Sequence, residues 1–183
     1  MHLVYLYLTY GFRVGILTEK DDFMKNITLR KINNADIDLL AKWLEKDYVL
    51  RWYHDTVDWL QEINGRNDMF NWIHHFIVMD KETPIGFCQY YDCYDANNME
   101  TWYDVTKPGD TFSIDYLIGN ESYLSNGYGK AIVKLLTETI GQKECANQVI
   151  VQPDEDNHAS THVLMANGYV YDECKKYYYK RLK

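Results

Sequence analysis

Two glycines, Gly127 and Gly129, stand one residue apart immediately before an apolar run with helical spacing. A strand that ends in a glycine-rich turn and opens a helix directs several backbone N–H groups outward, with the positive end of the helix dipole behind them. Phosphate oxygens bind at such a position, and Lys130 adds a cation at its rim. The dinucleotide and P-loop signatures are incomplete, so a tight turn without a ligand is the alternative.

A lone carboxylate, Asp115, lies in the middle of the apolar run FSIDYLIG. A carboxylate there could accept a proton from a reacting group, directly or through water. The structural alternative is a buried aspartate whose oxygens accept bonds from backbone amides. Because aspartate is depleted in strands, its presence favours a functional role.

Other reactive side chains give weaker patterns. His158 and His162 have the spacing of a metal pair on a helix, but no third ligand is evident, so we expect a solvated helix face and no metal. Cys88 and Cys93 could in principle act as nucleophiles. No His–Asp order accompanies them to activate a thiol, and buried cysteines are usually inert.

Composition limits the class of protein. The chain has 183 residues, which fits one domain, and a formal net charge of -8 with a pI near 5.2. This charge argues against a nucleic-acid binder and suits a small cationic partner, although solubility alone would also explain it. No run approaches the roughly 20 apolar residues of a membrane span. The cysteines lack C-x-x-C spacing, so we expect a cytoplasmic protein. We also expect a monomer or a homodimer.

The first residues are unusual. Met24 opens the run MKNITLRKI, which is typical of a natural start. We therefore interpret residues 1–23 as an N-terminal extension of unknown role and residues 24–183 as a single domain. The alternative is an edge hairpin that begins with VYLYLTY.

The remaining chain alternates between strand and helix patterns, which predicts a mixed α/β domain. Residues 95–110 form a long polar loop that contains Trp102 and Tyr103, and loops of this kind are often functional. The predicted strands cover residues 27–32, 74–80, 85–94, 111–119, 148–153, 169–173 and 177–182, and the predicted helices cover 33–46, a segment from about 55, 127–140 and 157–168.

The run from Leu124 to Gly129 resembles the [QR]-x-x-G-x-[GA] acetyl-coenzyme A pyrophosphate loop of the GCN5-related N-acetyltransferases (GNAT). Asn157-His158-Ala159 and Asn167-Gly168-Tyr169 are similar to the N-x-x-A and x-G-[FY] ending of that family. The runs PIGFCQYY, ETWYD and FSIDYLIG most resemble the aminoglycoside 6'-N-acetyltransferases. The resemblance implies the GNAT fold: a mixed, mostly antiparallel central sheet, flanked by helices, with splayed central strands.

The resemblance further implies acetyl-coenzyme A-dependent transfer of an acetyl group to the 6'-amine of aminoglycosides, by direct attack in a ternary complex, and hence antibiotic resistance. One alternative is N-acylation of a lysine-like amine in siderophore assembly or protein modification. A third hypothesis, from another class, is a non-catalytic domain that binds acyl-coenzyme A or an aminoglycoside.

Each site residue then has an implied role. An alkyl ammonium has a pKa of about 10.4, so Asp115 would take its proton before attack. A backbone N–H of Tyr116 or Leu117 would polarise the thioester carbonyl, and aromatic side chains with carboxylates would suit an aminosugar. The predicted substrate-binding residues are Trp52, Tyr91, Trp102, Tyr103, Asp104 and Asp115. The predicted cofactor-binding residues are Tyr116, Leu117, Ile118, Leu124, Ser125, Asn126, Gly127, Tyr128, Gly129, Lys130 and Asn157.

Three residues depart from the family pattern. Leu124 occupies the usual Gln/Arg position of the pyrophosphate loop. Gln152 stands where an acidic residue often contacts the aminoglycoside. Leu164 stands where many members place a tyrosine that protonates the leaving thiolate, so this chain lacks a side-chain acid at that position.

Overall fold

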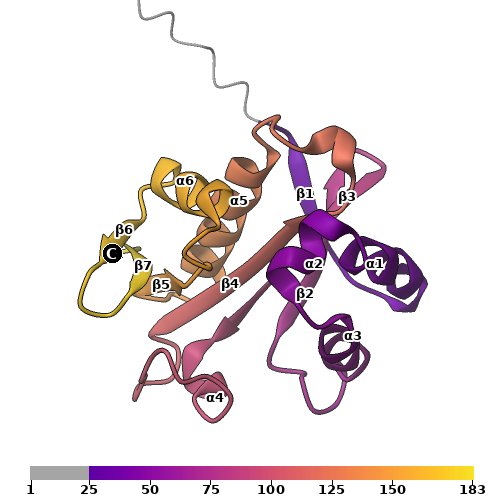
Figure 1. The fold of residues 1–183 in the computed structure, drawn as a ribbon. Coiled ribbons are helices and arrows are strands. Elements are labelled where there is room, and N and C mark those ends of the chain that lie inside the picture. Colours follow the sequence, from indigo (N-terminus) through magenta and orange to yellow (C-terminus); the bar gives the residue numbers. More distant parts are fainter. Residues whose placement is uncertain (1–24) are drawn as a thin grey trace, which may run out of the picture.

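The computed structural model describes residues 25–183, so the predicted extension at residues 1–23 lies outside the described part, and the domain boundary at residue 24 stays a prediction. A seven-stranded sheet in the order β1-β2-β3-β4-β5-β7-β6 forms the centre of the molecule (Figure 1). The strands are β1 (Ile27–Lys31), β2 (His74–Asp80), β3 (Thr83–Asp92), β4 (Thr111–Ile118), β5 (Gln148–Val151), β6 (Val170–Asp172) and β7 (Tyr177–Arg181).

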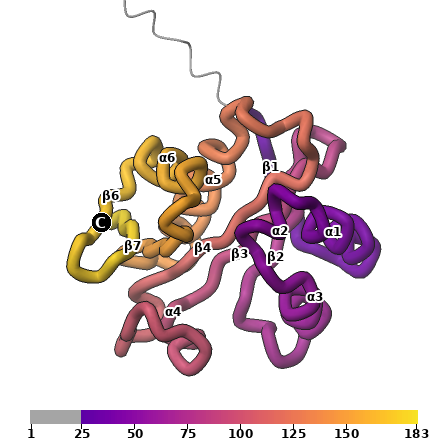
Figure 2. The backbone as a smooth tube through the Cα atoms, in the orientation of Figure 1, coloured from indigo at the N-terminus to yellow at the C-terminus, as the bar shows by residue number. Residues whose placement is uncertain are grey.

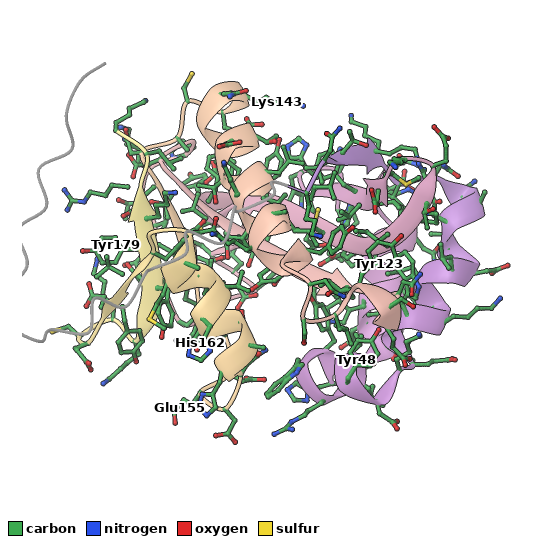
Figure 3. The ribbon with its side chains drawn as sticks, turned by 90° about the horizontal axis from the view of Figure 1, so that it is seen from above. Tyr48, Tyr123, Lys143, Glu155, His162 and Tyr179 are labelled. Atoms are coloured by element: carbon green, nitrogen blue, oxygen red, sulfur yellow. The ribbon has the colours of Figure 1, made fainter. Side chains whose placement is uncertain are left out.

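The helices cover both faces of this sheet. Figure 3 shows α6, which contains His162, beside α5, which ends at Lys143. None of the helices within residues 25–183 has both the length and the apolar character that a membrane span requires. The α-helices are α1 (Ile37–Leu44), α2 (Asp47–Tyr53), α3 (Thr56–Asn64), α4 (Cys93–Ala96), α5 (Tyr128–Lys143) and α6 (His158–Ala166), and the 3-10 helices are η1 (Asn34–Asp36) and η2 (Glu121–Tyr123).

The central strands separate part-way along their length. β4 pairs with β3 in antiparallel register over almost its full length, from Phe112 to Ile118. The parallel pairing with β5 is shorter and includes only Thr111–Ser113 of β4 and Gln148–Ile150 of β5. β4 therefore continues past β5 toward α2 (Figure 2). This confirms the predicted splay, and we call the opening beyond Ser113 the wedge.

Two hydrophobic cores lie on the two faces of the sheet. The face under α1, α2 and α3 buries Leu40, Trp43, Leu44, Val49, Ile63, Ile77, Phe87 and Leu117. The face under α5 and α6 buries, among others, Phe76, Val78, Cys88, Ile114, Ile132, Val133, Leu136, Ile140 and Leu164.

Side-chain alternation along β4 assigns its residues to these two faces, because successive side chains of a strand point in opposite directions. Leu117 packs in the core under α1 to α3. Ile114 and Tyr116 pack in the core under α5 and α6. Asp115 accordingly shares the face of Leu117, and its neighbour Tyr116 points toward the opposite layer.

Two short α-helices were not predicted from the sequence. The N-cap residue of α2, Lys46, makes no side-chain capping bond. Tyr48 instead anchors this helix to the end of β4, since its hydroxyl lies 3.0 Å from the carbonyl oxygens of Ile118 and Gly119. In α4, the side chain of Asp92 accepts a bond from the Tyr94 N–H, so the strand predicted to reach residue 94 ends at Asp92.

Gly119 permits a close approach between the end of β4 and α1. A Cβ added to Gly119 would lie 2.0 Å from the Trp43 ring, which is itself buried. Gly119→Ala should therefore lower the free energy of unfolding by about 1–3 kcal/mol, measured by thermal or urea unfolding.

Gly141→Ala is the matched control for this prediction. An added Cβ at Gly141 would meet the Leu182 side chain at an ordinary 3.7 Å. Since Gly141 lies inside α5, the alanine should raise stability by roughly 0.5–1 kcal/mol. Equal stability of the two variants would contradict the proposed clash at Gly119.

Candidate active site

A cavity of about 260 Å³ lies on the α3 side of the sheet, above the middle of β3 and β4. Its walls come from segments far apart in the sequence: α3, the residues before β2, the loop after α4, and the end of β5. Its lining residues are Trp59, Glu62, Trp72, Ile73, Gln89, Tyr91, Ala96, Met99, Glu100, Trp102, Ser113, Ile114, Asp115 and Gln152.

Asp115 lies in this cavity, opposite Gln89 of the neighbouring strand. Gln89 Nε2 donates a hydrogen bond to Asp115 Oδ2 at 3.1 Å, which fixes the carboxylate. The amide oxygen of Gln89 is buried and has no partner among the described residues. A buried acceptor without a donor is costly, so a ligand that supplies an N–H or O–H would be favoured here.

The surroundings of Asp115 make it a better proton acceptor. Burial raises the pKa of Asp115 to about 7, and the nearby carboxylates of Glu62 and Glu100 add to the rise, while the bond from Gln89 opposes it. A base is most effective when its pKa is near the working pH. Asp115 can therefore accept and release a proton near neutral pH.

The other two carboxylates are held in place by neighbouring side chains. Glu62 of α3 lies 3.1 Å from Nε2 of the buried His75. Glu100 accepts a bond from the Trp102 indole at 2.9 Å, and burial raises the pKa of Glu100. Three carboxyl groups beside several aromatic rings form a site that suits a cation with apolar surfaces.

The glycine loop lies at the start of α5, on the other layer of the molecule. Gly127 is the N-cap of this 16-residue helix and has a left-handed conformation, with φ of 81°. A Cβ added to Gly127 would have no neighbour within 4 Å, so the space beside this residue is open. Ser125 is also left-handed, with φ of 58°. Such a turn leaves N–H groups available to an anion.

One domain thus combines the wedge beside β4, a carboxylate base with a pKa near neutral pH, and a glycine loop before α5. The model of the GNAT acetyltransferase domain family matches residues 33–174. The chain belongs to the GNAT acetyltransferase family. As a GNAT acetyltransferase it uses acetyl-coenzyme A.

Individual relatives include aminoglycoside enzymes. The chain is 25% identical to the aminoglycoside N(6')-acetyltransferase type 1 of Klebsiella pneumoniae over 151 residues, which cover 79% of this chain and 73% of that protein. The protein of the same name from Serratia marcescens gives the same values. A crystal structure of AAC(6')-Ib with coenzyme A and kanamycin superposes with a TM-score of 0.71 and 21% identity, over 85% of this chain and 94% of that one.

The Legionella pneumophila aminoglycoside N(6')-acetyltransferase superposes with a TM-score of 0.67 and 15% identity, over 85% of this chain and 92% of that one. At these identities the structures establish the fold of this chain. They confirm the predicted GNAT architecture, with its mixed sheet and flanking helices.

The residues predicted to bind acetyl-coenzyme A can do so partly through backbone groups and partly through a side chain. The loop from Leu124 to Gly129 offers amides for the pyrophosphate, and β4 beyond Ser113 has no pairing with β5, which leaves Tyr116, Leu117 and Ile118 along the wedge. Asn157 caps α6 by accepting a bond from the Ser160 N–H at 3.1 Å. A bond from Asn157 to pantetheine would therefore use its Nδ2 group. These roles stay predictions.

The predicted substrate residues are only partly brought together. Tyr91, Trp102 and Asp115 line the cavity, and Tyr103 packs edge-on against Trp102 with ring centroids 4.5 Å apart. Trp52 does not line the cavity and lies under the Arg51 guanidinium, 4.5 Å from ring centroid to Cζ. Asp104 is exposed in the loop, outside the cavity lining. Substrate contacts by these two residues stay a prediction.

Sequence reasoning missed several cavity residues. Trp59 and Glu62 occupy a helix with an ordinary amphipathic pattern, so nothing in their spacing marked them. Glu100 lies beside Trp102 in a loop already singled out, and this proximity was a usable signal. Gln89 could have been found only through its pairing with Asp115. No group of three or more potential metal ligands is assembled among residues 25–183.

Tyr53, rather than its neighbour Trp52, points toward the reactive centre. Burial raises the pKa of Tyr53 well above its ordinary value, and the Asp115 carboxylate close to its hydroxyl adds to the rise. Its ring packs against Trp59 with centroids 4.7 Å apart. The C-terminal turn of α2 thus decides which of two adjacent aromatic side chains faces the site.

Proposed function

We propose that this acetyltransferase transfers the acetyl group of acetyl-coenzyme A to the 6'-amine of aminoglycosides in the cytoplasm and thereby confers resistance. The observation that carries the proposal is the cavity around Asp115, where Glu62 and Glu100 supply negative charge and aromatic side chains supply walls. Aminosugars combine cationic amines with apolar ring faces, which this lining complements. The aminoglycoside enzymes among its relatives support the same substrate class.

Space beside the cavity suits an acceptor with several rings. Gln152 lines both the cavity and a second hollow of about 410 Å³, which also includes Asp154 and Glu155. The reacting ring would occupy the smaller cavity, and the other rings would extend past Gln152. The two further carboxylates would attract additional amines of the same molecule.

The reaction is then a direct attack. Asp115 accepts a proton from the ammonium, and the Gln89 amide oxygen accepts a hydrogen bond from the same nitrogen, which orients it. Acetyl-coenzyme A supplies the activated acetyl group as a thioester. A backbone N–H of Tyr116 or Leu117 donates to the carbonyl oxygen as negative charge develops on it.

The two cysteines buried near the cavity, Cys88 and Cys93, are unsuited to form an acyl-enzyme. Cys88 and Cys93 are both fully buried, and burial raises the pKa of each thiol well above its ordinary value. A thiol, unlike a thiolate, is a poor nucleophile. Neither side chain is therefore suited to accept the acetyl group.

The deciding experiment measures thiol release from acetyl-coenzyme A with kanamycin, tobramycin and a panel of lysine derivatives in parallel. We expect efficient turnover of the aminoglycosides and acetylation at the 6' position by mass spectrometry and NMR. Turnover of lysine derivatives alone would show that the acceptor is a lysine-like amine and not an aminoglycoside. Binding of acetyl-coenzyme A and kanamycin without turnover would favour a binding domain.

Glu100→Gln tests the acidic recognition of the acceptor. Removal of one partly buried charge should raise KM for kanamycin roughly fivefold, because a partly exposed ion pair contributes about 1 kcal/mol. The change should leave the Kd for coenzyme A unaltered. Glu138→Gln, an exposed carboxylate on α5, is the matched control. Equal KM values for the two variants would show that Glu100 does not contribute to binding of the acceptor.

A further inference from the structure

A hydroxyl pair crosses from β4 to α6 on the side of the sheet opposite Asp115. The Tyr116 hydroxyl lies 2.9 Å from Ser160 Oγ, so the two side chains form a hydrogen bond. This contact joins the strand beyond its last pairing with β5 to the first turns of α6. It therefore lies beside the wedge, on the side of α5 and α6.

Helix geometry places this pair beside position 164. Ser160 and Leu164 are four residues apart, so they lie on one face of α6, one turn from each other. Long side chains on a helix lean toward its N-terminus, so a long residue at position 164 would cover the turn of Ser160. The residue at 164 is a buried leucine. The Tyr116 hydroxyl, from the strand, occupies that turn instead.

The reaction needs an acid as well as a base. A thiol has a pKa of about 8.5, so the thiolate that leaves an acetyl thioester must gain a proton at neutral pH or depart as an anion. Asp115 and Tyr116 are consecutive residues and point to opposite faces of β4. The strand thus presents a proton acceptor on the cavity side and a phenol on the side of α5 and α6.

We infer that the Tyr116 hydroxyl, assisted by Ser160, is the proton donor to the leaving thiolate in acetyl transfer. The ammonium first gives one proton to Asp115. The C–N bond to the acceptor then forms and the C–S bond breaks, and the second proton that the nitrogen loses passes to water. Tyr116 gives its proton to sulfur and regains one from Ser160, which exchanges with water. The inference rests on acetyl transfer itself and holds for any acceptor amine.

The environment of Tyr116 keeps it in the form that a donor needs. Burial raises the pKa of Tyr116 to about 12, and the bond with Ser160 opposes the rise. Its titratable neighbours in this layer include Tyr169 and, across the strand, Tyr53 and Asp115. The phenol is therefore protonated throughout the neutral range.

Tyr116→Phe tests the inference without removing the backbone N–H or the packed ring. We expect kcat to fall about 10²-fold with the best acceptor amine, since loss of a general acid typically costs 10²–10⁴. Ser160→Ala keeps the phenol and should cause a smaller loss. Tyr169→Phe is the matched control, because its buried hydroxyl also bonds a side-chain hydroxyl, Thr137 Oγ1, at 2.8 Å.

A titration of bound coenzyme A gives a readout that needs no acceptor and no turnover. The ultraviolet absorbance of the thiolate reports the pKa of the bound thiol. A donor at the sulfur favours the thiolate, so this pKa should be about one unit higher in Tyr116→Phe than in the wild type. Tyr169→Phe should match the wild type.

Two results would overturn the inference. One is an unchanged thiol pKa together with a kcat equal to that of Tyr169→Phe. The other is weaker coenzyme A binding in Tyr116→Phe with an unchanged thiol pKa, which would assign the side chain to packing alone. The thiol titration tests the role of Tyr116 even if kanamycin is not a substrate. An error in the proposed acceptor can therefore be distinguished from an error in the role of Tyr116.

Discussion

Asp115→Asn is expected to lower kcat by about 10²–10⁴-fold with kanamycin, because the amide cannot accept the proton of the ammonium. The substitution preserves the size of the side chain and can still bond Gln89, whose amide can present either its donor or its acceptor. Initial rates of thiol release over a range of kanamycin concentrations would measure the loss.

Separate measurements distinguish this loss from damage to the fold. The Tm of Asp115→Asn should not fall below that of the wild type, because burial disfavours the charged carboxylate that the variant removes. The Kd for coenzyme A should also be unchanged, since Asp115 faces the cavity and not the glycine loop. Full turnover by a correctly folded Asp115→Asn would reject Asp115 as the base.

The pH profile gives the second large effect. Since the pKa of Asp115 in the free enzyme is about 7, the residue is a carboxylate above that pH and a neutral acid below it. A neutral carboxyl group cannot accept a proton, so kcat/KM should fall tenfold for each pH unit below about 7. Between pH 7, where about half of Asp115 is ionised, and pH 5 this amounts to about a fiftyfold loss. Measurements of kcat/KM across this range would show this fall, which is the acidic limb of the pH profile.

The same limb should move in defined ways. A bound ammonium favours the carboxylate, so the limb in kcat should lie at a lower pH than the limb in kcat/KM. Glu62→Gln removes a charge that raises the pKa of Asp115, so it should shift the limb to lower pH, while Glu138→Gln should not. A limb that follows the pKa of the acceptor amine across several substrates would assign it to the substrate instead. A limb near 3.8, the ordinary value for aspartate, would contradict the raised pKa.

The sequence by itself determined the features that depend on local patterns. Gly127, directly before α5, has a left-handed backbone conformation that few other residues adopt, as the pattern indicates. Asp115 stands out because a carboxylate is unusual in an apolar strand. The order of strands and helices followed from hydrophobic period and capping residues, and the strand splay followed from the family resemblance. These signals are visible within a few residues of each other.

Only the tertiary structure decided which distant side chains meet. The helix α2 lacks a capping signal and forms where Tyr48 can bond the end of β4. Its last turn directs Tyr53 toward Asp115, although Trp52 is equally aromatic in the sequence. Glu62 enters the cavity because α3 packs across β2 and β3, and Tyr116 reaches Ser160 because β4 leaves β5 after three residues. Such contacts depend on the packing of whole elements, whose relative positions no local pattern encodes.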